Sequence, residues 1–135
     1  MAQTLRRLNP PTLPNAGALG YSQISIMEPG RLAFISGQVA WQEGGGPAPA
    51  DLGEQARLVC VNAKSALDAI GATPQDIALV RVYVTDLTPE RVGEAMAHLG
   101  ALFDGAQPSL TGIGVAALAG PDLQIEMEMT VRLPG

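Results

Sequence analysis

The chain has 135 residues, which is enough for one domain with its own core and too few for two ordinary domains. Hydrophobic residues make up 47% of it and charged residues only 16%, so it carries more apolar surface than a small monomer buries easily, which favours an oligomer. The net charge of −5, with only 8 lysines and arginines, disfavours binding to phosphate backbones, and nucleic acid is not an expected partner.

The number of cysteines and the first residues of the sequence indicate the cellular compartment. Cys60 is the single cysteine, which excludes an internal disulfide. The opening stretch has two arginines followed by prolines where a secretory signal would have an apolar run. No apolar stretch approaches the roughly 20 residues that cross a bilayer. We therefore expect a cytoplasmic protein with no membrane partner.

The first half of the chain predicts an arm, two strands, a loop and a helix. Residues 1–20 combine prolines with a glycine-rich exit, which is typical of an irregular arm. Residues 21–27 alternate, residues 31–40 are nearly continuously apolar, and the EPG turn between them predicts a hairpin. Residues 41–50 have the composition of a flexible loop. Asp51 and Glu54 have the spacing of a capping box, and apolar residues at steps of three and four continue the predicted helix.

The second half predicts a strand, a helix and two further strands. Val80, Val82 and Val84 lie on one side of an alternating stretch. Thr88 can cap a second helix that ends before Gly105. The stretch QPSLTGIGVAAL at 107–118 is taken as a strand, and residues 123–132 alternate most clearly of all.

These elements make one domain, residues 1–135, in the order β-β-α-β-α-β-β. Right-handed crossovers would place both helices on the same face of one mixed sheet, which is an α+β fold. The other face carries polar side chains such as Arg81 and Glu126, so solvent or another subunit must cover it.

No motif indicates a cofactor or a metal. GIGVAA at 112–117 matches a dinucleotide fingerprint but lies near the end of the chain, without the following helix or acidic residue. His98 is the only histidine and Cys60 falls on an apolar helix face, so we expect solvent for the first and core packing for the second. Glu126 and Glu128 lie on one strand side about 7 Å apart, which suits acid and base work only if a pocket adjoins them.

Five stretches along the chain occur in an order and spacing typical of one protein family. They are GYSQ at 20–23, ISGQV at 35–39, QARLVCVNAKSALDAIGA from Gln55, VRVYVTDL from Val80 and IEMEM at 125–129. Together they resemble the consecutive signatures of the RidA, or YjgF, family, some members of which are labelled endoribonuclease L-PSP. The resemblance covers nearly the whole chain.

The resemblance implies a chorismate-mutase-like fold and a homotrimer whose sheets face inward, with small-molecule clefts between subunits. The best-known members hydrolyse enamines and imines, releasing ammonia and a 2-keto acid. By position, Tyr21 would border the cleft, Ser36 and Gly37 would offer polar contacts, and Glu126 would position or activate the attacking water.

One position departs from the family pattern. Deaminating members typically read Pro, any residue, Arg, Ser or Thr, and the arginine holds the substrate carboxylate. Here the frame from Pro108 places Leu110 at the arginine position and Thr111 at the hydroxyl position, and both are candidate ligand-binding residues. Leucine offers none of the charge-assisted hydrogen bonds that arginine makes to a carboxylate.

Several functions therefore remain open. The favoured hypothesis is a family member whose cleft binds an unidentified small molecule, with an uncharged or differently presented substrate or with no turnover. The first alternative is imine deaminase activity with another cation, such as Arg81, in place of the missing one. The second is a non-catalytic interaction or chaperone-like trimer. The endoribonuclease label fits poorly with the net charge of −5, because RNA is itself negatively charged.

Overall fold

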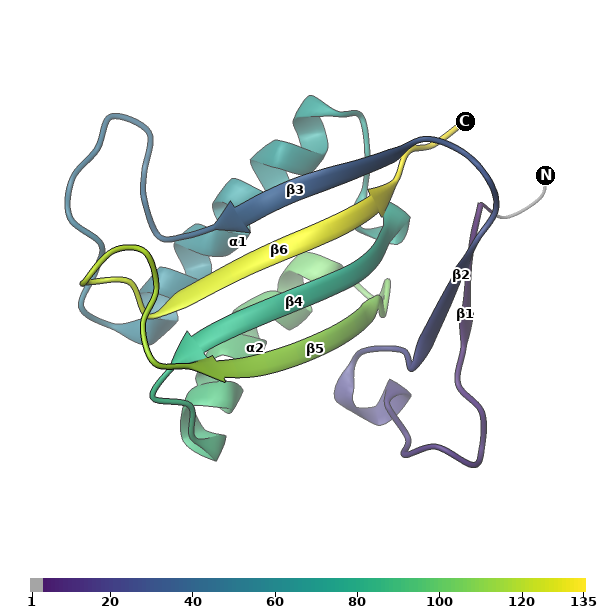
Figure 1. Cartoon of the computed structure of the whole chain (residues 1–135), viewed down its shortest axis with the longest axis horizontal. Coiled ribbons are helices and arrows are strands. Elements are labelled where there is room, and N and C mark those ends of the chain that lie inside the picture. Colours follow the sequence, from purple (N-terminus) through teal and green to yellow (C-terminus); the bar gives the residue numbers. More distant parts are fainter. Residues whose placement is uncertain (1–3) are drawn as a thin grey trace.

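A four-stranded mixed sheet forms the centre of the protein, in the order β3-β6-β4-β5 (Figure 1). The computed structural model describes residues 4–135. The strands are β3 (Leu32–Gln38), β4 (Ile77–Thr85), β5 (Ser109–Val115) and β6 (Ile125–Arg132). β6 pairs antiparallel with both β3 and β4, whereas β4 and β5 pair in parallel. The two parallel strands need a crossover connection, and a helix supplies it.

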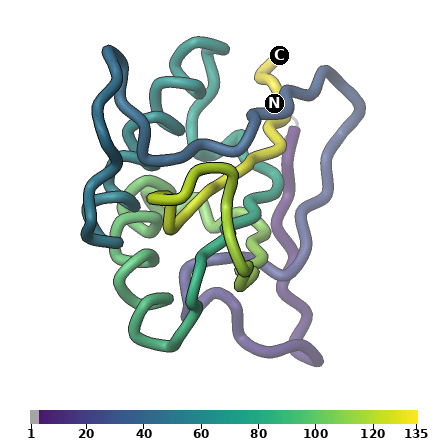
Figure 2. Tube along the Cα trace, turned by 60° about the vertical axis from the view of Figure 1, so that its left-hand side comes forward, coloured from purple at the N-terminus to yellow at the C-terminus, as the bar shows by residue number. Residues whose placement is uncertain are grey.

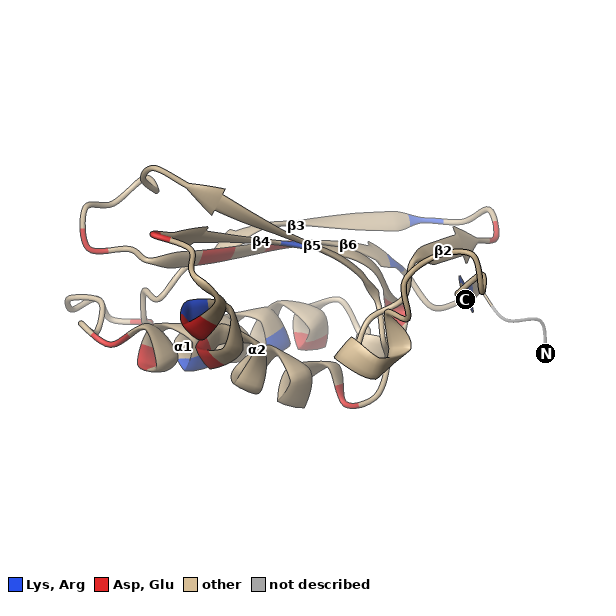
Figure 3. Ribbon diagram, turned by 90° about the horizontal axis from the view of Figure 1, so that it is seen from below, with Lys and Arg blue, Asp and Glu red and all other residues tan. Residues whose placement is uncertain are grey.

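Two helices cover one face of this sheet, as predicted, and leave the other face without a helix (Figure 3). α1 (Leu52–Ala69) begins where the Asp51 carboxylate accepts a hydrogen bond from the Glu54 backbone N–H. The Glu54 carboxylate pairs with Arg57 and so does not complete the predicted capping box. α2 (Pro89–Phe103) begins at the predicted cap, with the Thr88 hydroxyl accepting from the Arg91 N–H. The expected α+β fold is confirmed.

The core lies between the helices and the two central strands. Its largest fully buried side chains come mainly from α1, α2, β4 and β6; they include Phe103, Leu67, Ile77, Leu99, Ile125 and Met127. β6 alternates between this core and the open face, as its sequence pattern predicted. The face away from the helices is therefore free to carry polar side chains.

The predicted hairpin between residues 21–27 and 31–40 is wrong. β2 (Ile24–Met27) pairs with an earlier strand, and β3 pairs with β6. The Arg132 guanidinium explains the redirection, because it donates hydrogen bonds to the backbone carbonyls of Glu28 and Pro29. A Cβ on Gly30 would lie 2.2 Å from the Arg132 Cζ. The turn is thus fastened to the end of β6 and sends the chain into the main sheet.

The irregular arm predicted over residues 1–20 also needs correction. β1 (Leu5–Leu8) lies within it and pairs antiparallel with β2, and Gly17–Leu19 forms a short 3-10 turn, η1. Residues 1–3 lie outside the described residues. A four-residue strand becomes stable here because β2 supplies hydrogen-bonding partners far along the chain, which local composition does not show. The β1–β2 pair stands at one end of the molecule and the 41–50 loop at the other (Figure 2).

No helix within residues 4–135 has the length and apolar character needed to cross a membrane.

Candidate functional site

The register of β4 and β5 decides which way the candidate residues of β5 face. Val80 is the partner of Leu110, and Arg81 is the partner of Thr111. Paired residues on neighbouring strands project to the same side of a sheet. Val80 is fully buried beneath the helices, whereas Arg81 is exposed on the open face. Leu110 therefore faces the helices and Thr111 faces the open side.

Leu110 lines an apolar pocket of about 440 Å³ between β5, α2 and the segment around Tyr21. None of the residues lining it is charged. Its remaining walls are Leu19, Val82, Val84, Leu87, Val92, Gly93, Ala95, Met96, Leu99, Gly112 and Ile113. Leu110 is half-buried and packs against the hydrophobic core, so it forms an apolar wall with space beside it.

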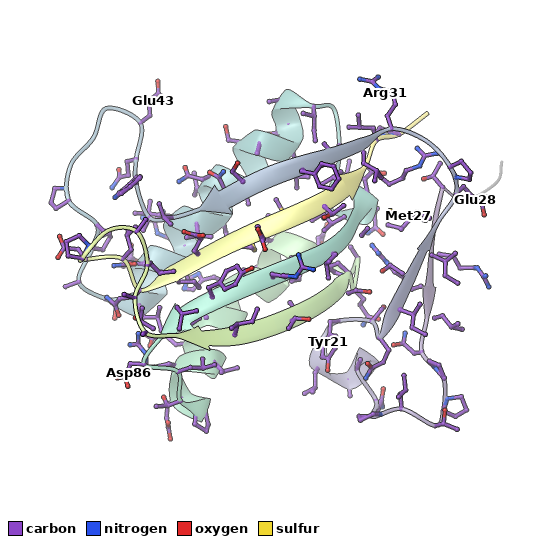
Figure 4. All side chains as sticks on the ribbon, viewed as in Figure 1. Tyr21, Met27, Glu28, Arg31, Glu43 and Asp86 are labelled. Carbon is purple, nitrogen blue, oxygen red and sulfur yellow. The ribbon has the colours of Figure 1, made fainter. Side chains whose placement is uncertain are left out.

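The segment before β2 positions Tyr21 at this pocket. Gly20 adopts a left-handed conformation, with φ of 87°, and ends the 3-10 turn. The Gln107 side chain donates to the Gly17 carbonyl, and the Ser22 N–H donates to the Pro108 carbonyl. These bonds tie the segment to the start of β5, where Figure 4 places Tyr21. Tyr21 and Leu110 thus line the same pocket.

A second group of candidates lies on the open face, at the opposite side of the sheet. The Glu126 carboxylate lies against Gly37 so closely that a Cβ there would be 2.3 Å from its Oε2. The strand register shifts between Ile35 and Gln38, and the irregularity contains Ser36 and Gly37. Within residues 4–135, no side chain forms an ion pair or a hydrogen bond with the Glu126 carboxylate. The Glu126 carboxylate is therefore not engaged by any other side chain of this face that the structure describes.

Its neighbour Glu128 is already engaged. The Tyr83 hydroxyl donates a hydrogen bond to Glu128, and this bond together with desolvation and the negative charge raises the pKa of Tyr83. The Arg81 Nη1 lies 3.6 Å from a Glu128 oxygen. Arg81 and Glu128 border a hollow of about 470 Å³ that is also lined by Ser36 and Phe34. The two glutamates of β6, although equivalent by sequence spacing, have different surroundings.

One chain does not bring all the candidate residues together. Tyr21 and Leu110 lie on the helix side at the β5 edge, whereas Ser36, Gly37 and Glu126 lie toward the β3 edge of the sheet. Thr111 is on the open face but also at the β5 edge. Arg81 is not beside Leu110, because the two residues project from opposite faces.

The α2 wall of the pocket was missed as part of a site. Val92 and Met96 of α2 line the pocket, and Val92 is 42% exposed. A glycine inside a predicted helix costs stability and is a signal of a special role, and Gly93 is such a glycine.

Cys60 and His98 lie away from both groups, in a groove between α1 and α2. Both are half-buried, so Cys60 packs against the core as expected, whereas His98 is less exposed than expected. Within residues 4–135 no three His, Cys, Asp or Glu side chains are placed to share a metal ion.

Burial raises the pKa of the Cys60 thiol to about 11. Only the thiolate is nucleophilic, so we expect alkylation of Cys60 by iodoacetamide to be slow at pH 7 and to keep accelerating up to about pH 11. Mass spectrometry of the folded protein against pH measures this. Free cysteine is the control, and its rate should level off near pH 9; a Cys60 profile that levels off there too would contradict the burial argument.

Comparisons with known proteins bear on the whole chain. The family model for Endoribonuclease L-PSP matches residues 14–133. The RutC family protein YjgH of Escherichia coli is 39% identical over 107 residues, covering 78% of each chain. The protein named "Putative reactive intermediate deaminase TdcF", from the same species, is 30% identical over 113 residues, covering 83% of this chain and 86% of the relative.

Solved structures agree with these matches. The Rid family protein YyfB of Yersinia pestis superposes with a TM-score of 0.91 at 38% identity, covering 97% of this chain and 100% of that one. Escherichia coli TdcF with bound serine superposes with a TM-score of 0.68 at 30% identity, covering 83% and 87%.

Proposed function

Because the chain belongs to the endoribonuclease L-PSP family, which is the RidA or YjgF family, we propose that it is a small-molecule-binding member without the standard imine deaminase activity. The observation that carries this proposal is the position of Leu110 in an uncharged pocket where deaminating members have a carboxylate-binding arginine. Small-molecule binding is supported by the relative TdcF, which was solved with bound serine.

The division of the candidate residues supports an assembly with clefts between subunits. The α+β chorismate-mutase-like fold exposes the β5 edge with Tyr21 and Leu110, and separately exposes Glu126 beside Gly37. A homotrimer would bring the β5 edge of one copy against the open face of the next. Phe34 is 77% exposed on that face, and burying it between copies would stabilise the assembly.

A coupled assay tests the proposal. An amino acid oxidase or dehydratase generates the imine, and release of the 2-keto acid is followed with and without the protein. We expect no acceleration above buffer, because a substrate carboxylate entering the pocket would lose its hydration and find no cation beside Leu110. Acceleration equal to that of an arginine-bearing family member, run as the positive control, would overturn the proposal.

One observation favours a second candidate, which is imine deamination with Arg81 as the substituting cation. Arg81 projects over the same sheet face as Glu126 and borders the same hollow as Ser36. Its only ion partner among the described residues is Glu128, at a separation long for a charge-assisted hydrogen bond. If the assay shows turnover, Arg81→Gln should abolish it in this second candidate and leave it unchanged otherwise.

A further inference from the structure

Two of the residues that line the pocket between β5 and α2 have no side chain. Gly93 lies on α2 and Gly112 lies on β5. A Cβ built on either glycine would meet no heavy atom within 4 Å. Neither glycine has the positive φ that requires a missing side chain, so their backbones would accept other residues. The structure therefore has room for side chains that the sequence does not provide.

Glycine inside a helix or a strand lowers stability relative to most residues. No close contact explains either glycine, since nothing presses on the place where the side chain would be. Their common effect is to keep open a volume of about 440 Å³, which is in the range of pockets for small ligands. Exposed apolar side chains border the entrance, with Leu19 at 69% and Val92 at 42% exposure.

The chemistry of the lining restricts the ligand. All the lining side chains are apolar except Tyr21, whose hydroxyl is the only polar side-chain group of the pocket. Moving a carboxylate or an ammonium from water into such a site without a partner charge is unfavourable, whereas an apolar group gains from burial. A neutral molecule with an apolar body and one hydrogen-bonding group matches this lining.

We propose that this pocket binds a neutral, largely apolar small molecule and that Gly93 and Gly112 keep the pocket open for it. The inference rests on the proposed function and specifies the ligand class for the part of the cleft around Leu110. It concerns binding alone, so it is tested without turnover.

Benzamide and benzoate are suitable probes, because they have nearly the same shape and differ in charge. Isothermal titration of the full chain should give a Kd for benzamide at least tenfold lower than that for benzoate. Equal affinities, tighter binding of benzoate, or no binding of benzamide would overturn the inference. Imine turnover does not enter this titration, so its result and that of the coupled assay are independent.

Gly93→Leu fills the pocket, and Gly100→Leu is the matched control. Gly100 lies on the same helix with an equally open Cβ, but it does not line the pocket. Both substitutions should raise the midpoint of thermal unfolding by a few degrees, because each removes a helix glycine. Only Gly93→Leu should weaken benzamide binding, at least tenfold. Unchanged binding in Gly93→Leu would overturn the inference.

Gly112→Val provides a second variant should Gly93→Leu fail to fold, since valine is favoured in strands. It should also weaken benzamide binding at least tenfold. A second copy of the chain is the other possible occupant of the pocket. Light scattering of each variant tests for it by measuring the oligomeric state. If a substitution that fills the pocket dissociates an oligomer of the chain, the pocket serves contact between subunits and the inference is overturned.

Discussion

Replacing Leu110 with arginine is expected to increase affinity for small carboxylates about a hundredfold. The guanidinium would lie in the pocket beside Tyr21, with its fork free, because no acidic residue lines that space. A forked pair of charge-assisted hydrogen bonds contributes roughly 1.5 to 3 kcal/mol per bond, part of which is offset by partial burial of the arginine. A gain of about 2.8 kcal/mol corresponds to a hundredfold change in Kd.

Titration with benzoate measures this gain, and benzamide is the control ligand, which should not gain affinity. Thr111→Arg is the matched control variant, because its side chain projects from the opposite face of β5. The same Leu110→Arg protein enters the coupled imine assay. Turnover there would show that Glu126 and the rest of the cleft are competent, whereas improved benzoate binding without turnover would show that more than the arginine has changed. Failure to bind benzoate more tightly would contradict the assignment of this position to the pocket.

Replacing Gln55 with leucine is expected to lower the free energy of unfolding by at least about 3 kcal/mol. Gln55 is fully buried at the start of α1. Its Nε2 donates to the carbonyls of Pro49 and Asp122 at 2.7 and 2.8 Å, and its Oε1 accepts from the Gln124 N–H at 2.9 Å. Leucine would leave three backbone groups without partners, at about 1 to 3 kcal/mol each.

This side chain joins the 41–50 loop to the loop before β6, two segments far apart in sequence that lie at the same end of the molecule (Figure 1). Urea denaturation measures the loss. Gln42→Leu is the control, because Gln42 is exposed in the same loop, and its effect should stay within about 0.5 kcal/mol. A loss below about 1 kcal/mol for Gln55→Leu would show that the loops do not depend on this amide.

The local elements of the fold were predictable because local chemistry forms them. Asp51 and Thr88 cap the two helices at the predicted positions, and the alternation of β6 matches its burial from Ile125 to Val131. The hairpin was not predictable in the same way. Arg132, more than 100 residues along the chain, holds the turn at Glu28 and Pro29. Such a contact leaves no local pattern in the sequence.

The candidate site shows the same difference between features set by local sequence and features set by contacts between distant segments. By itself the sequence determined the family, the candidate residues and the presence of Leu110 where an arginine is expected, since these depend on residue identity and order. Only the tertiary structure decided that Leu110 faces α2, that Arg81 faces the opposite side, and that Glu126 lies against Gly37 far from Tyr21. The physical reason is strand register: a shift of one residue reverses every side chain, and register is set by pairing between distant segments.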